Sequence, residues 1–193
     1  MYLFDRPYQY FNEPWPHIVI ENVLPKNAAD RMLNNWPDNL PTRGKDYSYY
    51  DDEWFSGHKD QVFHDFEQVN FIDRADDVLK ALAEAFNETV VDDCDIDGLL
   101  YRDDIPSNLP LRDWHVDYPS KKYHGILYIG SGENSEFVAG NKKTGIDKPY
   151  EYRHNRLIMW RNTPDTFHKF YCGVKSRKTI SIAVNYKLGY SQQ

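Results

Sequence analysis

The sequence has 193 residues, of which 40% are hydrophobic, 27% charged and 16% aromatic. This composition is that of a water-soluble globular protein and excludes an intrinsically disordered chain. The length suits one domain, residues 1–193, and is too short for two domains of ordinary size.

The net charge of -7 and the lack of a basic stripe argue against a nucleic-acid-binding protein. No stretch approaches the roughly 18 consecutive apolar residues of a membrane span, so we expect no membrane insertion. The two cysteines, Cys94 and Cys172, form no metal-binding or disulfide motif. With no apolar leader segment visible after Met1, these features together predict a cytoplasmic protein.

Helical support is predicted over about 24–90. A strand at 17–23 is followed by a helix over 26–36, with Pro25 in the favoured first turn. A second helix is predicted over 71–88, because its apolar residues recur at helical spacing on one face. Between these helices, residues 38–66 have no regular period, and this aromatic segment is either a substrate lid or a passive cover.

The second half of the chain changes character and predicts a β-core over about 96–187. Eight short strand-like segments are separated by turn residues, at 99–102, 111–116, 125–129, 136–138, 150–153, 157–160, 166–171 and 178–186. Strands at this spacing are typical of sandwiches and barrels. We therefore expect an α+β fold, a double-stranded β-helix (jelly roll) backed by N-terminal helices.

A pair of metal-ligating residue types occurs in the sequence His115-Val116-Asp117. In a strand, residues two apart point to the same face, so an imidazole and a carboxylate are expected side by side. Such a pair suits Fe(II), Mn(II) or Zn(II). The same pattern occurs at His58 and Asp60, but that copy lies in the irregular segment and is interpreted as a surface pair.

A third ligand is suggested by His168, because Arg177 follows nine residues later in a clean strand pattern. On that strand the residues Arg177, Thr179, Ser181 and Ala183 alternate with bulky apolar side chains. One face is therefore expected to pack on helices and the other to line a cavity. An arginine on an inward face needs an anion, and a bidentate carboxylate is its best partner.

The ordered set of His115, Asp117, His168 and Arg177 resembles the Fe(II)- and 2-oxoglutarate-dependent oxygenases, most closely their prolyl-hydroxylase-like branch. The resemblance covers roughly residues 95–187. It implies that the two histidines and the aspartate form the metal-binding and catalytic triad for Fe(II). It further implies that O2 and 2-oxoglutarate are consumed, that succinate and CO2 are released, and that a substrate is hydroxylated.

The same resemblance assigns the co-substrate site. Arg177 is expected to bind the distal carboxylate of 2-oxoglutarate, and Thr179 or Ser181 to assist with a hydroxyl group. Tyr128, on the strand after the His-x-Asp pair, resembles a tyrosine that reaches the same carboxylate.

The substrate class stays open at this point. A prolyl or other peptidyl residue is favoured by the resemblance, and a small molecule such as an amino acid is the other possibility. The alternative function is a cupin-like metal-binding jelly-roll protein without oxygenase activity. Arg177 argues against that alternative, since such sites need no clamp for a 2-oxo acid.

Overall fold

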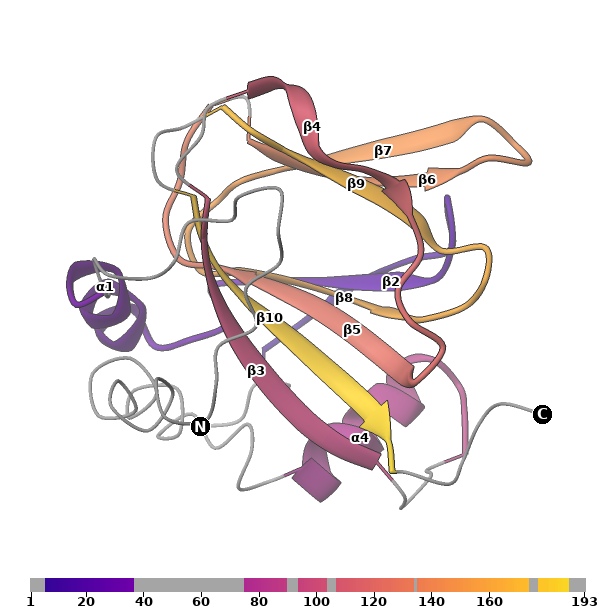
Figure 1. Cartoon of the computed structure of the whole chain (residues 1–193). Helices are drawn as coiled ribbons and strands as arrows, with labels where there is room; N and C mark the ends of the chain where they lie inside the picture. Colours follow the sequence, from indigo (N-terminus) through magenta and orange to yellow (C-terminus); the bar gives the residue numbers. More distant parts are fainter. Residues whose placement is uncertain are drawn as a thin grey trace.

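A computed structural model of the chain describes residues 6–36, 75–89, 94–103, 107–133, 135–173 and 177–187. Two antiparallel sheets face each other, and two helices lie on one of them (Figure 1). The segment predicted as a lid or cover, 38–66, lies outside the described residues.

The larger sheet has six strands in the order β1-β2-β8-β5-β10-β3. Its strands are, in that order, Gln9–Phe11, His17–Glu21, Arg156–Arg161, Lys121–Tyr128, Arg177–Tyr186 and Cys94–Asp103. The smaller sheet has four strands in the order β4-β9-β6-β7. These are Ser107–His115, Phe167–Cys172, Glu136–Asn141 and Ile146–Glu151.

Strand β10 shows how the larger sheet serves two environments. Its residues Ile180, Ile182 and Val184 are buried in a core cluster with the helices. Thr179 and Ser181, which alternate with them along the strand, point to the opposite face and line a cavity. This alternation follows from the two-residue period of a strand, and it confirms the two faces predicted for this segment.

The two helices cover the outer face of the larger sheet. Helix α1, Lys26–Asn34, contributes Ala29 and Met32 to the core cluster on that face, and helix α4, Ala75–Ala85, contributes Leu82. In Figure 1 both helices lie on the side of the sheet that faces away from β4, β6, β7 and β9. Within the described residues, no helix is long and apolar enough to cross a membrane.

A second core fills the space between the sheets and is largely aromatic. Phe137 of β6 stacks on Trp160 of β8, with ring centroids 5.0 Å apart. Trp15 contacts both rings and donates its indole N–H to the carbonyl of Gly140, 3.1 Å away. These large buried side chains fill part of the space between the two sheets.

The predicted elements agree with the structure in type. Helices are found within 26–36 and 71–88, and each of the eight predicted strand segments overlaps one of the strands β3 to β10. The bounds differ most at β7, where the prediction covers 150–153 and the strand spans Ile146–Glu151. Most of β7 is exposed at the sheet edge, so its residues lack the apolar alternation that marks a strand. Strand β1 was not predicted, for the same reason.

Trp114 of β4 packs over a glycine of the smaller sheet. Its side chain is partly exposed on the outer face of the smaller sheet. The ring covers Gly140, where an added Cβ would lie 2.3 Å from it, and the ammonium of Lys169 lies 4.3 Å from the ring centroid.

We predict that His17 makes the stability of the fold depend on pH. Burial lowers the pKa of His17 to about 4, because the ring is fully buried, and this effect outweighs the opposing hydrogen bond between Nδ1 and the carbonyl of Trp15. In the unfolded chain the pKa is about 6.5, so between pH 6.5 and pH 4 the unfolded state binds more protons. This contribution is fully present above pH 6.5 and is lost as the pH falls towards 4.

Urea unfolding at pH 7 and pH 5 checks this. The native protein is expected to lose about 2 kcal/mol more free energy of unfolding over this interval than the His17→Gln variant. Equal losses in both proteins would contradict the assignment.

We predict that Gly130→Ala destabilises the fold by about 2 to 4 kcal/mol. Gly130 has φ 137°, and an added Cβ would lie 2.3 Å from the hydroxyl oxygen of Tyr152. That hydroxyl donates to the Ile129 carbonyl and accepts from the Lys178 N–H, so it has no room to move. Gly145→Ala is the matched control, because Gly145 also has a positive φ but open space around the Cβ position. Denaturant unfolding should show a distinctly smaller loss for Gly145→Ala, and similar losses would argue against the steric cause.

Candidate functional site

The cavity between the two sheets brings together most of the predicted site residues. Its lining comes from both sheets and from the turn that joins β4 to β5. The residues are His115, Asp117, Lys121, His124, Ile126, His168, Phe170, Arg177, Thr179 and Ser181.

His115 and His168 form a cross-strand pair on the smaller sheet. They lie directly opposite each other on β4 and β9, with ring centroids 4.3 Å apart. In each ring Nδ1 faces a backbone carbonyl two residues earlier, that of Asp113 at 2.7 Å and that of Thr166 at 3.0 Å. A carbonyl only accepts, so Nδ1 carries a proton, and in the neutral ring Nε2 then keeps its lone pair. This arrangement of the second ring nitrogen is typical of metal-binding histidines.

Asp117 reaches the same place by a different route from the one predicted. Strand β4 ends at His115, so Asp117 lies in the connection to β5 and not on the strand itself. The turn that follows is closed by a hydrogen bond from the Lys121 N–H to the Tyr118 carbonyl. The carboxylate is buried, with Oδ2 3.6 Å from Nε2 of His168. Two ligands of one ion, each about 2.0 to 2.2 Å from it, are separated by about 3 to 3.6 Å.

His124 was not among the site residues predicted from the sequence. It lies in β5, fully within the larger sheet, and faces the cavity. Nδ1 of His124 is 2.6 Å from Oδ2 of Asp117, and Nε2 is 2.7 Å from Oγ of Ser181. The alternation along β5 was a usable signal, because His124, Ile126 and Tyr128 share one face.

Lys121 places a positive charge next to the carboxylate. Its Nζ lies 3.1 Å from Oδ1 of Asp117 and 3.5 Å from Nε2 of His124. Burial favours the neutral acid, but the neighbouring His124 and His168 rings and the Lys121 ammonium outweigh it and hold the pKa of Asp117 below its usual range. Burial lowers the pKa of His124, and the nearby ammonium acts in the same direction. An ionised carboxylate beside a neutral imidazole is therefore the resting state of this pair.

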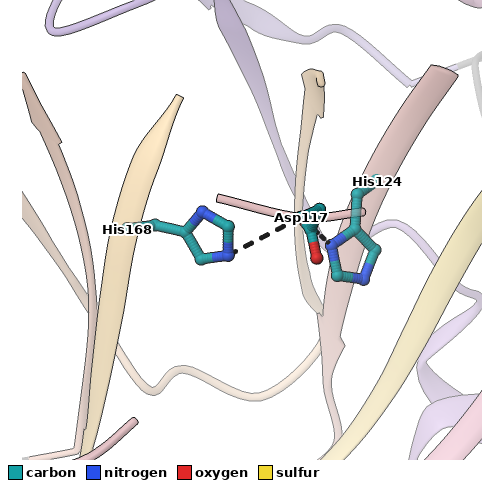
Figure 2. A group of neighbouring side chains, drawn as sticks. All are labelled: Asp117, His124 and His168. Atoms are coloured by element: carbon teal, nitrogen blue, oxygen red, sulfur yellow. Dashed lines mark hydrogen bonds and ion pairs between the residues drawn. The ribbon is translucent and has the colours of Figure 1, made fainter. Parts of the chain in front are cut away.

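Asp117, His124 and His168 form a compact group that can hold a metal ion (Figure 2). Their ligand atoms all lie within 4.8 Å of one another, and all three side chains are buried. Figure 2 shows the His168 and His124 rings on opposite sides of the carboxylate, each directed towards it. The site thus contains a third imidazole beyond the predicted pair of histidines.

Arg177, the first residue of β10, is buried and lines the cavity. Its side chain is 1% exposed, and Cζ lies 5.4 Å from the ring centroid of Tyr128 and 5.1 Å from that of Phe170. Burial raises the pKa of Tyr128, with Arg177 opposing the shift, so the hydroxyl stays protonated. A guanidinium beside a cavity suits a carboxylate, which it can bind through two parallel hydrogen bonds.

The predicted co-substrate residues have different positions. Arg177, Thr179 and Ser181 line the cavity along β10, as expected from their alternation. Tyr128 is not one of the residues that line the cavity, but it pairs with Thr179 across β5 and β10, and its ring contacts the guanidinium. The hydroxyl of Ser181 faces His124.

No protein-family model matches the sequence, and none of the curated protein sequences is similar enough to be identified as a relative. Solved structures do match over most of the chain. A prolyl-4-hydroxylase from Pseudomonas putida matches with a TM-score of 0.59 at 12% identity, covering 89% of this chain and 92% of the other. A prolyl hydroxylase from Trichoplax adhaerens, in complex with a hypoxia inducible factor peptide fragment, matches with a TM-score of 0.58 at 11% identity, covering 88% and 83%.

A third match extends the comparison beyond prolyl hydroxylases. The dioxygenase for auxin oxidation 1 from Arabidopsis thaliana, in complex with 2-oxoglutarate, matches with a TM-score of 0.53 at 13% identity, covering 88% of this chain and 76% of the other. At these identities the likeness establishes the fold. The chain therefore has the fold of the prolyl hydroxylases and of a 2-oxoglutarate-binding dioxygenase, and the resemblance predicted from the sequence is confirmed at that level.

Proposed function

We propose that the protein is an Fe(II)- and 2-oxoglutarate-dependent dioxygenase that hydroxylates a peptidyl residue, such as proline, or a small molecule, such as an amino acid. Residues 1–193 would form a single oxygenase domain. The observation that carries the proposal is one cavity whose lining combines His115, Asp117 and His168 with the buried Arg177 of the facing sheet. When bound, iron and 2-oxoglutarate supply the oxidising chemistry, with O2 consumed and succinate and CO2 released.

The strand order supports the jelly-roll form of this fold. From β3 to β10 successive strands alternate between the sheets, except for the β6–β7 hairpin. The order β8-β5-β10-β3 then faces β7-β6-β9-β4, which is the arrangement of a double-stranded β-helix. In this arrangement the ligand-bearing strands β4 and β9 lie side by side, opposite the strands β5 and β10.

His115, Asp117 and His168 are the metal ligands in this proposal. Both histidines direct a deprotonated Nε2 away from the backbone, as a ligand must, and the carboxylate is ionised. Two imidazoles and one carboxylate suit Fe(II) and leave three coordination positions for other molecules.

Arg177 holds the distal carboxylate of 2-oxoglutarate in this proposal, with Thr179 as a hydroxyl donor beside it. The aromatic rings of Tyr128 and Phe170 lie against the guanidinium. A buried, oriented guanidinium binds a carboxylate more strongly than an exposed one does. The protonated hydroxyl of Tyr128 can donate to the same carboxylate.

The two substrate classes each have a structural relative. The Trichoplax adhaerens protein binds a peptide fragment, which favours a peptidyl substrate, and the Arabidopsis thaliana protein is named for the oxidation of auxin, which favours a small molecule. Both share this fold, so the fold alone does not choose between them.

A cupin-like metal-binding protein is the second candidate, and His124 is the observation that favours it. If His124 ligates the ion in addition to the proposed triad, three imidazoles and one carboxylate occupy it. Two positions then remain, which is too few for a chelating 2-oxo acid and O2 together. Such a protein would bind a metal ion but would not act as this kind of oxygenase.

We predict that Mn(II), a stable substitute for Fe(II), raises the thermal unfolding temperature of the protein. Binding at one hundred times the dissociation constant stabilises the folded state by about 2.7 kcal/mol. His168→Ala should abolish the shift, because it removes a ligand. His154→Ala should retain it, since His154 lies outside the cavity. A shift that survives His168→Ala would place the metal elsewhere.

The oxygenase function is tested by adding Fe(II) and 2-oxoglutarate to the protein without oxygen and recording the visible spectrum. We expect a weak charge-transfer band from the chelated 2-oxo acid. His115→Ala should abolish the band. Arg177→Ala should lower the apparent affinity for 2-oxoglutarate at least tenfold, because it removes a charge-assisted carboxylate contact of about 1.5 to 3 kcal/mol.

Arg153→Ala is the control, because Arg153 is an exposed arginine that pairs with Glu151 outside the cavity. A metal-loaded protein that gives no band would contradict the oxygenase function and leave the cupin-like candidate.

A further inference from the structure

A hydrogen-bonded chain runs from the larger sheet to the carboxylate of the site. Oγ of Ser181 on β10 lies 2.7 Å from Nε2 of His124 on β5. Nδ1 of His124 lies 2.6 Å from Oδ2 of Asp117, and Figure 2 marks this second interaction with a dashed line. All three side chains are buried, with 6% to 8% of each residue exposed. A buried polar chain of this kind restricts the carboxylate to one orientation.

The directions of these hydrogen bonds follow from the donors around the ring. The Lys121 ammonium lies 3.5 Å from Nε2 and can only donate, so Nε2 is an acceptor. The Ser181 hydroxyl donates to the same nitrogen. Nδ1 therefore carries the proton of the neutral ring and donates it to Asp117. In His115 and His168 the Nδ1–H groups are donated to backbone carbonyls instead of a carboxylate.

We infer that His124 is a positioning residue that holds Asp117 in place for metal binding, and that Lys121 opposes metal binding at the same carboxylate. This inference rests on the proposed metal site. The ring of His124 turns its N–H, and not a lone pair, towards the carboxylate. A ligand would have to turn a lone pair towards the ion, so His124 contacts the ligand Asp117 and does not bind the ion itself.

Lys121 has the opposite effect on metal affinity. Its ammonium lies 3.1 Å from Oδ1 of Asp117, and its side chain is only 19% exposed, so solvent screens the charge weakly. It neutralises the buried carboxylate when no ion is present. A divalent cation on Asp117 is repelled by this ammonium and shares a carboxylate with it, so the lysine lowers the affinity for the metal.

The connection of Ser181, His124 and Asp117 also resembles the order of a Ser-His-Asp hydrolase triad, but the surroundings differ. Ser181 lies in the middle of β10, paired with Leu99 of β3 on one side and Ile126 of β5 on the other. Its neighbouring backbone N–H groups belong to the sheet and cannot form an oxyanion hole, which hydrolytic triads need. The chain is therefore suited to holding Asp117 rather than to nucleophilic attack.

Titration of Co(II) alone, followed by its visible absorption, tests the inference without 2-oxoglutarate or turnover. His124→Leu removes the donor and is expected to weaken Co(II) binding about 10- to 100-fold, the usual effect of losing a residue that orients a ligand. His124→Asn places an amide N–H near the position of Nδ1 and should recover part of this loss. Lys121→Met is expected to tighten binding by about threefold to tenfold, since it removes a like charge.

The spectrum of the saturated complex separates a positioning residue from a ligand. With His124 outside the ligand set, the band positions at saturation should be the same in His124→Leu as in the native protein. A changed spectrum that indicates a lost ligand would overturn the inference, and so would unchanged affinity in His124→Leu or weaker binding in Lys121→Met. Circular dichroism checks that each variant is folded, and His154→Leu is the matched control outside the cavity.

These outcomes are distinct from those of the oxygenase test. A native 2-oxoglutarate band together with unaltered Co(II) affinity in His124→Leu would uphold the function and reject the positioning role. The expected Co(II) affinities without a 2-oxoglutarate band would uphold the positioning role and reject the oxygenase.

Discussion

Strand β10 has to satisfy two opposite environments, and the site depends on this. Ile180, Ile182 and Val184 bind the sheet to the helices through an apolar core, while Arg177 and Ser181 turn polar groups towards the other sheet. Each residue is fixed in its environment by the pleat, because a shift of one residue would bury the polar set among helices and expose the apolar set to the cavity. The helices thus contribute to the site without touching it, by fixing the register of the strand that carries the arginine.

Charge is concentrated in the cavity between the two sheets. Asp117, Lys121 and Arg177 line one cavity, next to the rigid aromatic core that contains Phe137 and Trp160. Burying a lone carboxylate or a lone guanidinium costs free energy. Each group stays charged when an ionic partner or a hydrogen-bonding ligand contacts it. The rings of Trp15, Phe137 and Trp160 pack against one another beside this cavity, so the polar groups have a rigid apolar neighbour.

The sequence predicted the type of most elements because the apolar alternation of β10 and the helical stripe of α4 are local patterns. It predicted the cavity-lining role of Arg177 for the same reason. The place of Asp117 after the end of β4 was not predictable, because a strand's last residue depends on which partner continues the ladder. Strand β1 lies at a sheet edge, where exposure weakens the pattern. His124 was missed because its function depends on Asp117 and Ser181, which are neighbours only after the sheets have formed.

The surroundings of Asp117 reflect two requirements that conflict. Before a metal binds, the buried carboxylate needs positive charge and hydrogen bonds to stay ionised, and Lys121 and His124 supply them. When a metal binds, it takes over the neutralising role, and the lysine becomes a competitor while the histidine remains useful as a donor. Residues that stabilise a binding site in the free protein need not favour the bound state. Because the imidazole is neutral and the ammonium is charged, the two neighbours of one carboxylate affect metal affinity in opposite directions.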